Sequence, residues 1–120
     1  MFKRHLYELI LAGKKTQTRR PLDKKGTRSP EVGKRVGIRY DYFHKTAAWI
    51  LIKHKSRQRL GNVTVEDAFK EGFLDLDSFR AAWIEIYRQW QPKQIVWVYE
   101  FELATQGSAS TSKPSQQATP

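Results

Sequence analysis

The chain has 120 residues, no cysteine and a formal net charge of +10. This length suits one domain with a modest core, and the lack of cysteine excludes disulfides and thiolate metal sites. No apolar run approaches the length of a transmembrane helix, so we expect no membrane contact, and the lack of cysteine favours a cytoplasmic protein.

The positive charge is concentrated in the first half of the chain. Residues 1–60 carry a net charge of +13, whereas residues 61–103 carry −4. This asymmetry favours one electropositive face, which would attract polyanions such as RNA. A generally charged, well-solvated surface is the alternative that charge alone leaves open.

The first predicted element is a helix, because Leu6, Leu9 and Ile10 recur at helical spacing and Gly13 suits its end. The stretch KKTQTRRP, residues 14–21, should be an ordered turn followed by an extended loop, and residues 21–33 a further loop. Alternating patterns then predict strands over residues 34–43 and 47–60.

The second half begins with a capping box at Thr64, which predicts a short helix that ends at Gly72. Asp77 is predicted to cap a longer helix over residues 78–90, whose buried face comprises Phe79, Trp83, Ile86, Tyr87 and Trp90. The alternating pattern over residues 94–103 predicts a final strand. One side of this strand carries Ile95, Trp97, Tyr99, Phe101 and Leu103.

Residues 104–120 contain no aromatic or branched aliphatic side chain. Such a segment cannot bury enough apolar surface to fold, so we expect a folded domain over residues 1–103 and a disordered tail over 104–120. The order of helix, strands, two helices and strand favours an α+β fold, with helices packed on a small, curved, mostly antiparallel sheet.

The sequence LAGKKTQTRRP, residues 11–21, resembles the signature of ASCH domains, which are small β-barrels related to the PUA RNA-binding domain. The later stretches PEVGKRVGI, TVEDAFKEGF, SFRAAWIEIY and QIVWVYEFEL follow in the family's order. The resemblance covers residues 1–103. It implies a PUA-like β-barrel with a cleft that accepts RNA or a nucleotide-like ligand.

The basic loop after the first helix is a candidate anion site. Its cations would surround phosphates while its hydroxyls complete the hydrogen bonds; the residues are Lys14, Lys15, Thr16, Thr18, Arg19 and Arg20. A structural alternative is that the lysines offset the negative end of the helix dipole and the arginines are solvated. The loop is no nucleotide-triphosphate P-loop, because the earlier glycine is missing.

Some ASCH domains resemble amidohydrolases that act on N4-acylated cytidine with a Lys, a Thr and a Glu. That pattern falls here on Lys15, Thr18 and Glu71. A Thr hydroxyl needs a base before it can attack an amide carbonyl, and a Lys15 amine of lowered pKa would serve. Alternatively, Lys15 and Glu71 form an ion pair between loop and helix.

The stretch KHKSRQR places a basic residue at every second position: Lys53, Lys55, Arg57 and Arg59. On a strand all would share one face and could follow a phosphate backbone, or else protect an edge strand from aggregation. Arg39 would extend this surface, and Tyr40 and Tyr42 are candidates for stacking on bases.

The three histidines are scattered, so we expect no zinc site and no cofactor. The leading prediction is an RNA- or nucleotide-binding domain that uses a cationic cleft. A small amidohydrolase, or a protein-interaction module with a basic face, are the alternatives. The sequence does not predict an oligomeric state.

Overall fold

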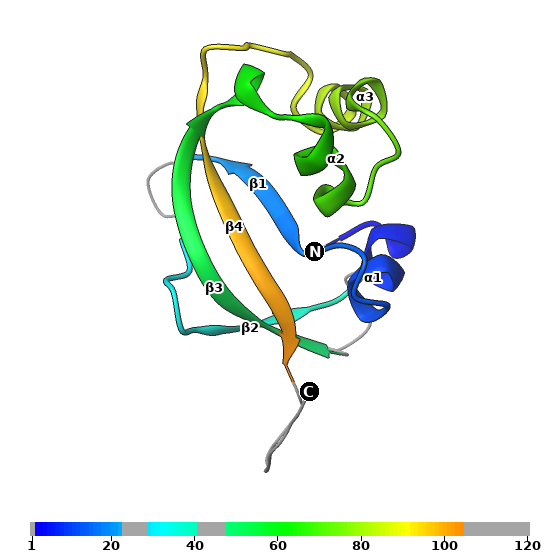
Figure 1. Ribbon diagram of the computed structural model, residues 1–120, viewed down its shortest axis with the longest axis vertical. Coiled ribbons are helices and arrows are strands. Elements are labelled where there is room, and N and C mark those ends of the chain that lie inside the picture. The colour runs from blue at the N-terminus through cyan, green and yellow to red at the C-terminus, as the bar shows by residue number, and fades with distance from the viewer. Residues whose placement is uncertain (1, 23–28, 41–47, 105–120) are drawn as a thin grey trace.

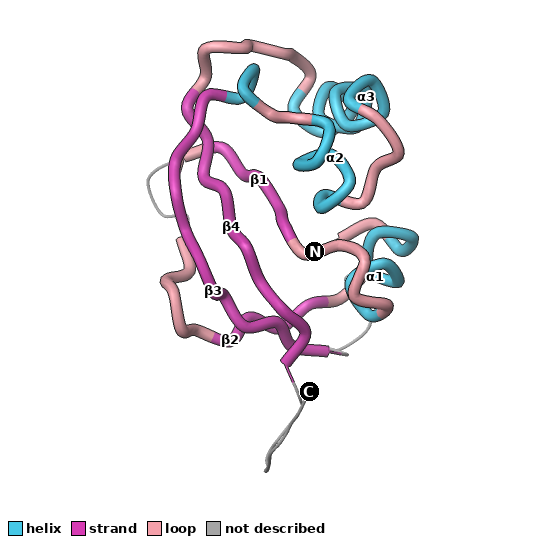
Figure 2. The backbone as a smooth tube through the Cα atoms, viewed as in Figure 1, coloured by secondary structure: helices cyan, strands magenta, loops and turns pink. Residues whose placement is uncertain are grey.

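The computed structural model describes residues 2–22, 29–40 and 48–104 (Figures 1 and 2). Its elements are α1 (Arg4–Leu11), β1 (Gln17–Pro21), β2 (Arg35–Ile38), β3 (Ala48–Arg59), η1 (Leu60–Asn62), α2 (Val65–Glu71), α3 (Leu76–Tyr87) and β4 (Ile95–Ala104). None of the helices in these ranges has the length and apolar character of a bilayer-spanning segment.

The strands form one antiparallel sheet in the order β1-β4-β3-β2. The α+β class is therefore confirmed. The sheet is strongly curved but not closed, so within the described residues β1 and β2 are free edges and the predicted barrel is only approximate. The helices gather on one side of this arc, with α1 near β2 and with α2 and α3 at the other end (Figure 1).

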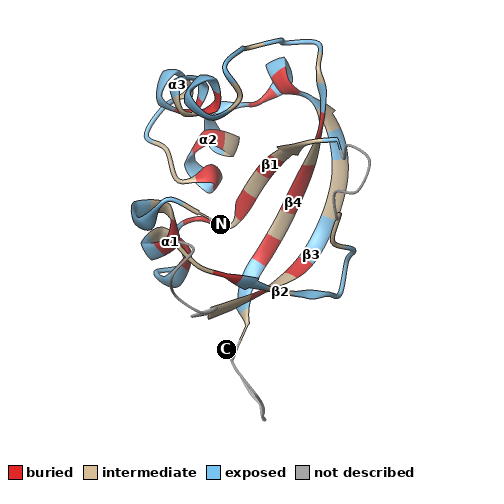
Figure 3. Ribbon diagram, turned by 180° about the vertical axis from the view of Figure 1, so that it is seen from behind, coloured by how far each residue is buried: buried red, intermediate tan, exposed pale blue. Residues whose placement is uncertain are grey.

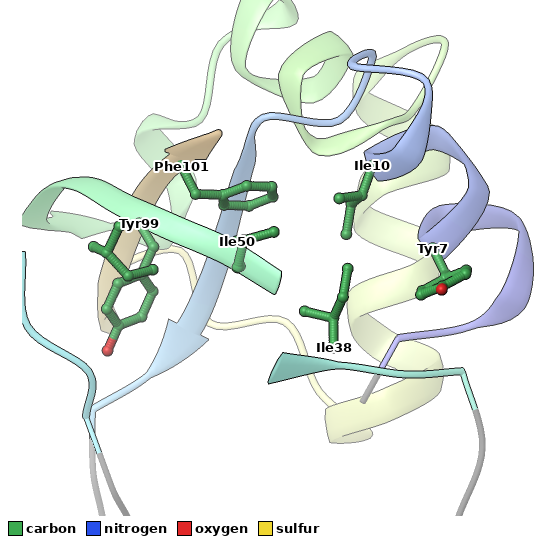
Figure 4. Packing of buried hydrophobic residues seen from close by; sticks show 7 residues of the cluster. Tyr7, Ile10, Ile38, Ile50, Tyr99 and Phe101 are labelled. Atoms are coloured by element: carbon green, nitrogen blue, oxygen red, sulfur yellow. The ribbon is translucent and has the colours of Figure 1, made fainter. Parts of the chain in front are cut away.

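Two apolar clusters hold the helices to the sheet. The first joins α1 to β2, β3 and β4, and its buried members are Tyr7, Ile10, Ile38, Ile50, Ile52, Tyr99 and Phe101 (Figure 4). The second lies under α2 and α3, and its buried members are Leu60, Val63, Ala68, Phe79, Trp83 and Val96. Residues that belong to or pack against the two clusters also line the site described below.

The start of α2 is confirmed as a capping box. Thr64 Oγ1 accepts from the Asp67 amide and Asp67 Oδ2 accepts from the Thr64 amide, both at 3.0 Å. The prediction that Asp77 caps the next helix is wrong. Asp75 caps it instead, with Oδ1 accepting from the Ser78 amide at 2.7 Å, and this start brings Leu76 into contact with the second cluster.

Near the ends of α3 and β4, hydrophobic periodicity predicts more burial than the structure shows. Ile86 is exposed although it follows the spacing of the buried face of α3, and it lies outside both clusters near the end of this helix. Ile95 and Leu103, near the two ends of β4, lie outside both clusters and are exposed.

Element boundaries also differ from the predictions. The predicted loop over residues 14–21 contains β1, and the predicted strand over 34–43 is strand only at Arg35–Ile38, since residues 39–40 leave the ladder. Residues 41–43, with Tyr42, and the predicted tail beyond Ala104 lie outside the described residues.

Candidate functional site

The basic segment after α1 is a strand with one buried side. Gly13 turns the chain at a φ of +76°, and β1 then pairs with β4. Lys15, Gln17 and Arg19 are buried, whereas the residues between them are half-buried, and Figure 3 shows this alternation along β1. Three of the polar side chains in this segment are therefore directed into the protein.

Lys15 is anchored to the end of α2. Its Nζ donates to the carbonyl oxygen of Glu71 at 2.7 Å and to that of Gln17 at 2.9 Å, and lies 3.4 Å from Glu71 Oε1. Both side chains are almost fully buried. The ion pair between the basic segment and the helix, one of the two sequence-based alternatives, is therefore present.

Arg19 holds the other oxygen of the same carboxylate. Its Nη1 lies 2.9 Å from Glu71 Oε2 and its Nη2 3.2 Å from Asp67 Oδ2. Further donors bind the side-chain oxygens of Gln58 and Gln17. Because these protein groups occupy the guanidinium, Arg19 fixes Glu71 in place rather than presenting a free cation.

Burial sets the protonation tendencies of the pair. It lowers the pKa of Lys15, against the opposing effect of the Glu71 carboxylate. It raises the pKa of Glu71, against the opposing effects of Lys15 and Arg19. Burial therefore brings the pKa values of the two groups closer together than in water, which makes proton transfer between them less costly.

A pocket of about 630 Å³ lies between the start of α1, β1 and α3. Aromatic rings form much of its wall, namely Phe2, Tyr40, Phe73, Phe79, Trp83 and Tyr87. Six of the predicted site residues line it: Lys15, Thr18, Arg19, Arg20, Tyr40 and Glu71. Elements far apart in the sequence thus converge on one apolar cavity with a charged side.

Phe2 lines the pocket, although it is not among the predicted site residues. Its ring centroid lies 5.2 Å from the Arg20 guanidinium carbon and 5.8 Å from Lys15 Nζ. Its amide donates to the Arg39 carbonyl oxygen at 3.0 Å, which fixes the segment before α1. Phe2 precedes Leu6 by one helical turn, and that spacing does not separate a pocket wall from a core position.

Other predicted residues lie outside the pocket lining. Lys14 is exposed on the turn before β1, and Arg39 is half-buried. Thr16 has a backbone role, since its amide donates to the Lys70 carbonyl oxygen at 2.9 Å and its carbonyl accepts from Phe101 at 3.0 Å. The structure therefore divides the predicted basic segment into pocket residues and flanking residues.

The sequence profile of the ASCH domain family matches residues 1–105. The chain belongs to the ASCH domain family. Among solved structures it is similar to an ASCH domain from Lactobacillus crispatus JV V101, with a TM-score of 0.72 and 20% identity over 82% of this chain and 70% of that one.

A second similar structure is a protein from Enterococcus faecalis V583. It has a TM-score of 0.66 and 22% identity, over 82% of this chain and 69% of the other. At these identities the two structures support the fold alone. A comparison with curated protein sequences found no match.

The basic residues at every second position of β3, here called the basic ladder, are Lys53, Lys55, Arg57 and Arg59. In this ASCH domain a β-bulge between Ile52 and His54 interrupts the ladder. The prediction that all four cations share a face is wrong for Lys53, whose Nζ lies 3.7 Å from Glu102, on the face of β4 opposite Trp97 and Tyr99. The other three, Lys55, Arg57 and Arg59, stand beside Tyr99, Trp97 and Ile95 of β4.

The ladder of the ASCH domain also lies on an open edge. β2 pairs with β3 only as far as Leu51, so within the described residues the second half of β3 has β4 as its single neighbouring strand. Charge on this edge is consistent with protection from aggregation, the structural alternative. In the same described ranges, no group of three His, Asp or Glu side chains is placed to hold a metal ion.

Proposed function

We propose that this ASCH domain binds RNA or a nucleotide-like ligand in the pocket between α1, β1 and α3. The observation that carries the proposal is the convergence of Lys15, Thr18, Arg20 and Tyr40 on one cavity with aromatic walls. Its volume, about 630 Å³, lies within the range typical of small-molecule sites. The cysteine-free sequence supports a cytoplasmic setting.

The pocket offers separate surfaces for a base and for a phosphate. The rings of Phe2 and Tyr40 form the part of the wall that a base would contact, and the guanidinium carbons of Arg20 and Arg4 lie 5.2 Å and 5.0 Å from their respective centroids. Arg20 lines the same cavity and has no carboxylate partner among the described residues, so its charge is available to a phosphate. The Thr18 hydroxyl can donate to or accept from the ligand.

The test is a titration with uridine 5′-monophosphate, cytidine 5′-monophosphate and short RNA at two salt concentrations. Arg20→Gln should weaken binding about tenfold, because it removes a charge-assisted hydrogen bond. Lys93→Gln removes an exposed cation outside the pocket lining and should leave the affinity unchanged. Absence of binding at low salt would refute the proposal.

The amidohydrolase alternative is favoured by one specific observation. Lys15, Thr18 and Glu71 line the same pocket, and burial lowers the pKa of Lys15. In this alternative the neutral Lys15 amine takes the proton from Thr18, whose oxygen attacks the acyl carbonyl. The bond between the acyl carbon and N4 breaks, and N4 takes the proton from Lys15, which Glu71 orients, so that cytidine leaves. Water then hydrolyses the acyl–Thr18 ester to a carboxylic acid and restores the hydroxyl.

Incubation with N4-acetylcytidine tests this alternative directly. Cytidine should form with the wild-type protein and not with Thr18→Val, which keeps the size of the side chain. No product from the wild type, or equal product from Lys15→Ala, eliminates the enzymatic assignment.

A further inference from the structure

Beside the pocket, the sheet carries a row of cations around one tryptophan. Trp97 of β4 is directly opposite Arg20 on β1 and Arg57 on β3, and Ile95 is opposite Arg59. Residues directly opposite one another in an antiparallel sheet share a face. Arg20, Trp97 and Arg57 therefore form one line across three strands, about 10 Å from end to end at the usual strand spacing.

Lys55 and Arg57 of this row lie near the ring of Trp97, and most of the cations in the row lack acidic partners. The Arg57 guanidinium carbon lies 5.5 Å from the centroid of Trp97, and Lys55 Nζ lies 4.2 Å from it. Lys55 is paired with Glu31 at 3.1 Å. In the described ranges, Arg20, Arg57 and Arg59 have no carboxylate partner.

The opposite face of β3 and β4 differs in its balance of charge. There Lys53 Nζ lies 3.7 Å from Glu102, and His54 Nδ1 lies 3.7 Å from Glu100. Cations and carboxylates alternate on that face, whereas the uncompensated arginines are on the face of Trp97. A polyanion would therefore be attracted to one side of the sheet.

We propose that the ligand of this ASCH domain is a single-stranded polynucleotide that leaves the pocket at Arg20 and continues over Trp97 to Arg57 and Arg59. The inference rests on the pocket-binding function proposed above. Arg57 and Arg59 are two residues apart on a strand, about 7 Å, and each contacts one phosphate. Trp97 and the exposed Ile95 contact a base or sugar between them.

The experiment compares uridine 5′-monophosphate with hexauridylate, and with hexathymidylate to separate RNA from DNA. The hexamer of at least one type should bind more tightly than the monophosphate. Arg57→Gln and Arg59→Gln should reduce this gain and leave binding of the monophosphate unchanged. Each should lower the slope of log K against log salt concentration for the hexamer by about 0.7, and the double variant by about 1.4.

Lys53→Gln is the matched control, because it removes a cation from the same strand on the opposite face. It should change neither the gain nor the slope. If the monophosphate binds but neither hexamer binds more tightly, or if Lys53→Gln acts like Arg57→Gln, the track is wrong and the pocket proposal survives. If no nucleotide or hexamer binds, the pocket proposal itself fails.

Discussion

Lys15 and Glu71 are 56 residues apart in the sequence and meet in the interior of the protein. The Lys15 ammonium lies 2.7 Å from the Glu71 carbonyl oxygen and 3.4 Å from its carboxylate, while Arg19 binds the second carboxylate oxygen. This contact ties the basic strand to the end of α2. It therefore supports both the stability of the domain and the shape of the pocket.

Glu71→Gln should destabilise the domain strongly. The substitution keeps the side-chain size but leaves Lys15 and Arg19 buried without the Glu71 carboxylate. Breaking a buried ion pair costs about 3–5 kcal/mol, and the remaining amide oxygen places the expected loss near the lower limit. Urea denaturation measures it.

The control for this variant is Glu66→Gln, an exposed position on the same helix, with an expected change of about 0.5 kcal/mol or less. Equal losses from the two substitutions would show that the buried network contributes no special stability.

Protonation of the Asp67 carboxylate should lower the stability of the domain in acid. Burial acts to raise its pKa, but hydrogen bonds with Thr64 and the charge of Arg19 outweigh this, and the pKa lies below the ordinary value of 3.8. The carboxylate therefore contributes its full stabilisation above pH 3.8 and loses it as the pH falls through the lower native value.

The measurement is the free energy of unfolding of the wild type and of Asp67→Asn, from about pH 7 down to about pH 2. The difference between the two proteins should be constant at the upper end and shrink below the ordinary carboxyl pKa. A difference that grows with acidity would contradict the assignment.

Gly72→Ala should be more harmful than Gly13→Ala. Both glycines have positive φ, so each substitution costs about 1–2 kcal/mol in backbone strain. At Gly72 an added Cβ would lie 3.1 Å from side-chain carbons of Leu6 and Leu9, whereas at Gly13 nothing lies within 4 Å. Thermal denaturation of the two variants should show the larger decrease for Gly72→Ala. The reverse order would mean that α1 and α2 pack less closely than the structure shows.

Lys14→Gln should leave nucleotide binding unchanged, within about twofold, although it removes a cation next to Lys15. Lys14 is exposed on the turn and does not line the pocket. The same titrations that detect the about tenfold loss from Arg20→Gln provide the comparison. A loss of similar size from Lys14→Gln would extend the binding surface to the turn.

The elements with strong local chemistry could be predicted from the sequence. The capping box at Thr64, the left-handed Gly72 and the buried Phe79 and Trp83 each depend on residues within a few positions of one another. The meeting of Lys15, Thr18 and Glu71 in one pocket was implied by the resemblance to ASCH domains, and no spacing within the chain required it.

The buried side of β1 could not be predicted because its residues are polar. Burial of Arg19 is stabilised by Gln58, Asp67 and Glu71, which follow it by 39 to 52 residues, and local pattern does not report such partners. The β-bulge at Lys53 could not be predicted either, since no glycine or proline lies at that point of the sequence. These two features decide which cations face inward, which face a pocket and which lie on the sheet.

The position of Phe2 has a practical consequence for the attachment of affinity tags and fluorophores. The ring of Phe2 forms part of the pocket wall, and its amide is bonded to Arg39. Any peptide joined ahead of it would start beside the cavity and compete with the guest molecule for space. The end of β4 at Ala104 lies at the far end of the sheet from α3 (Figure 1), so a label joined at that point would start away from the α3 side of the cavity.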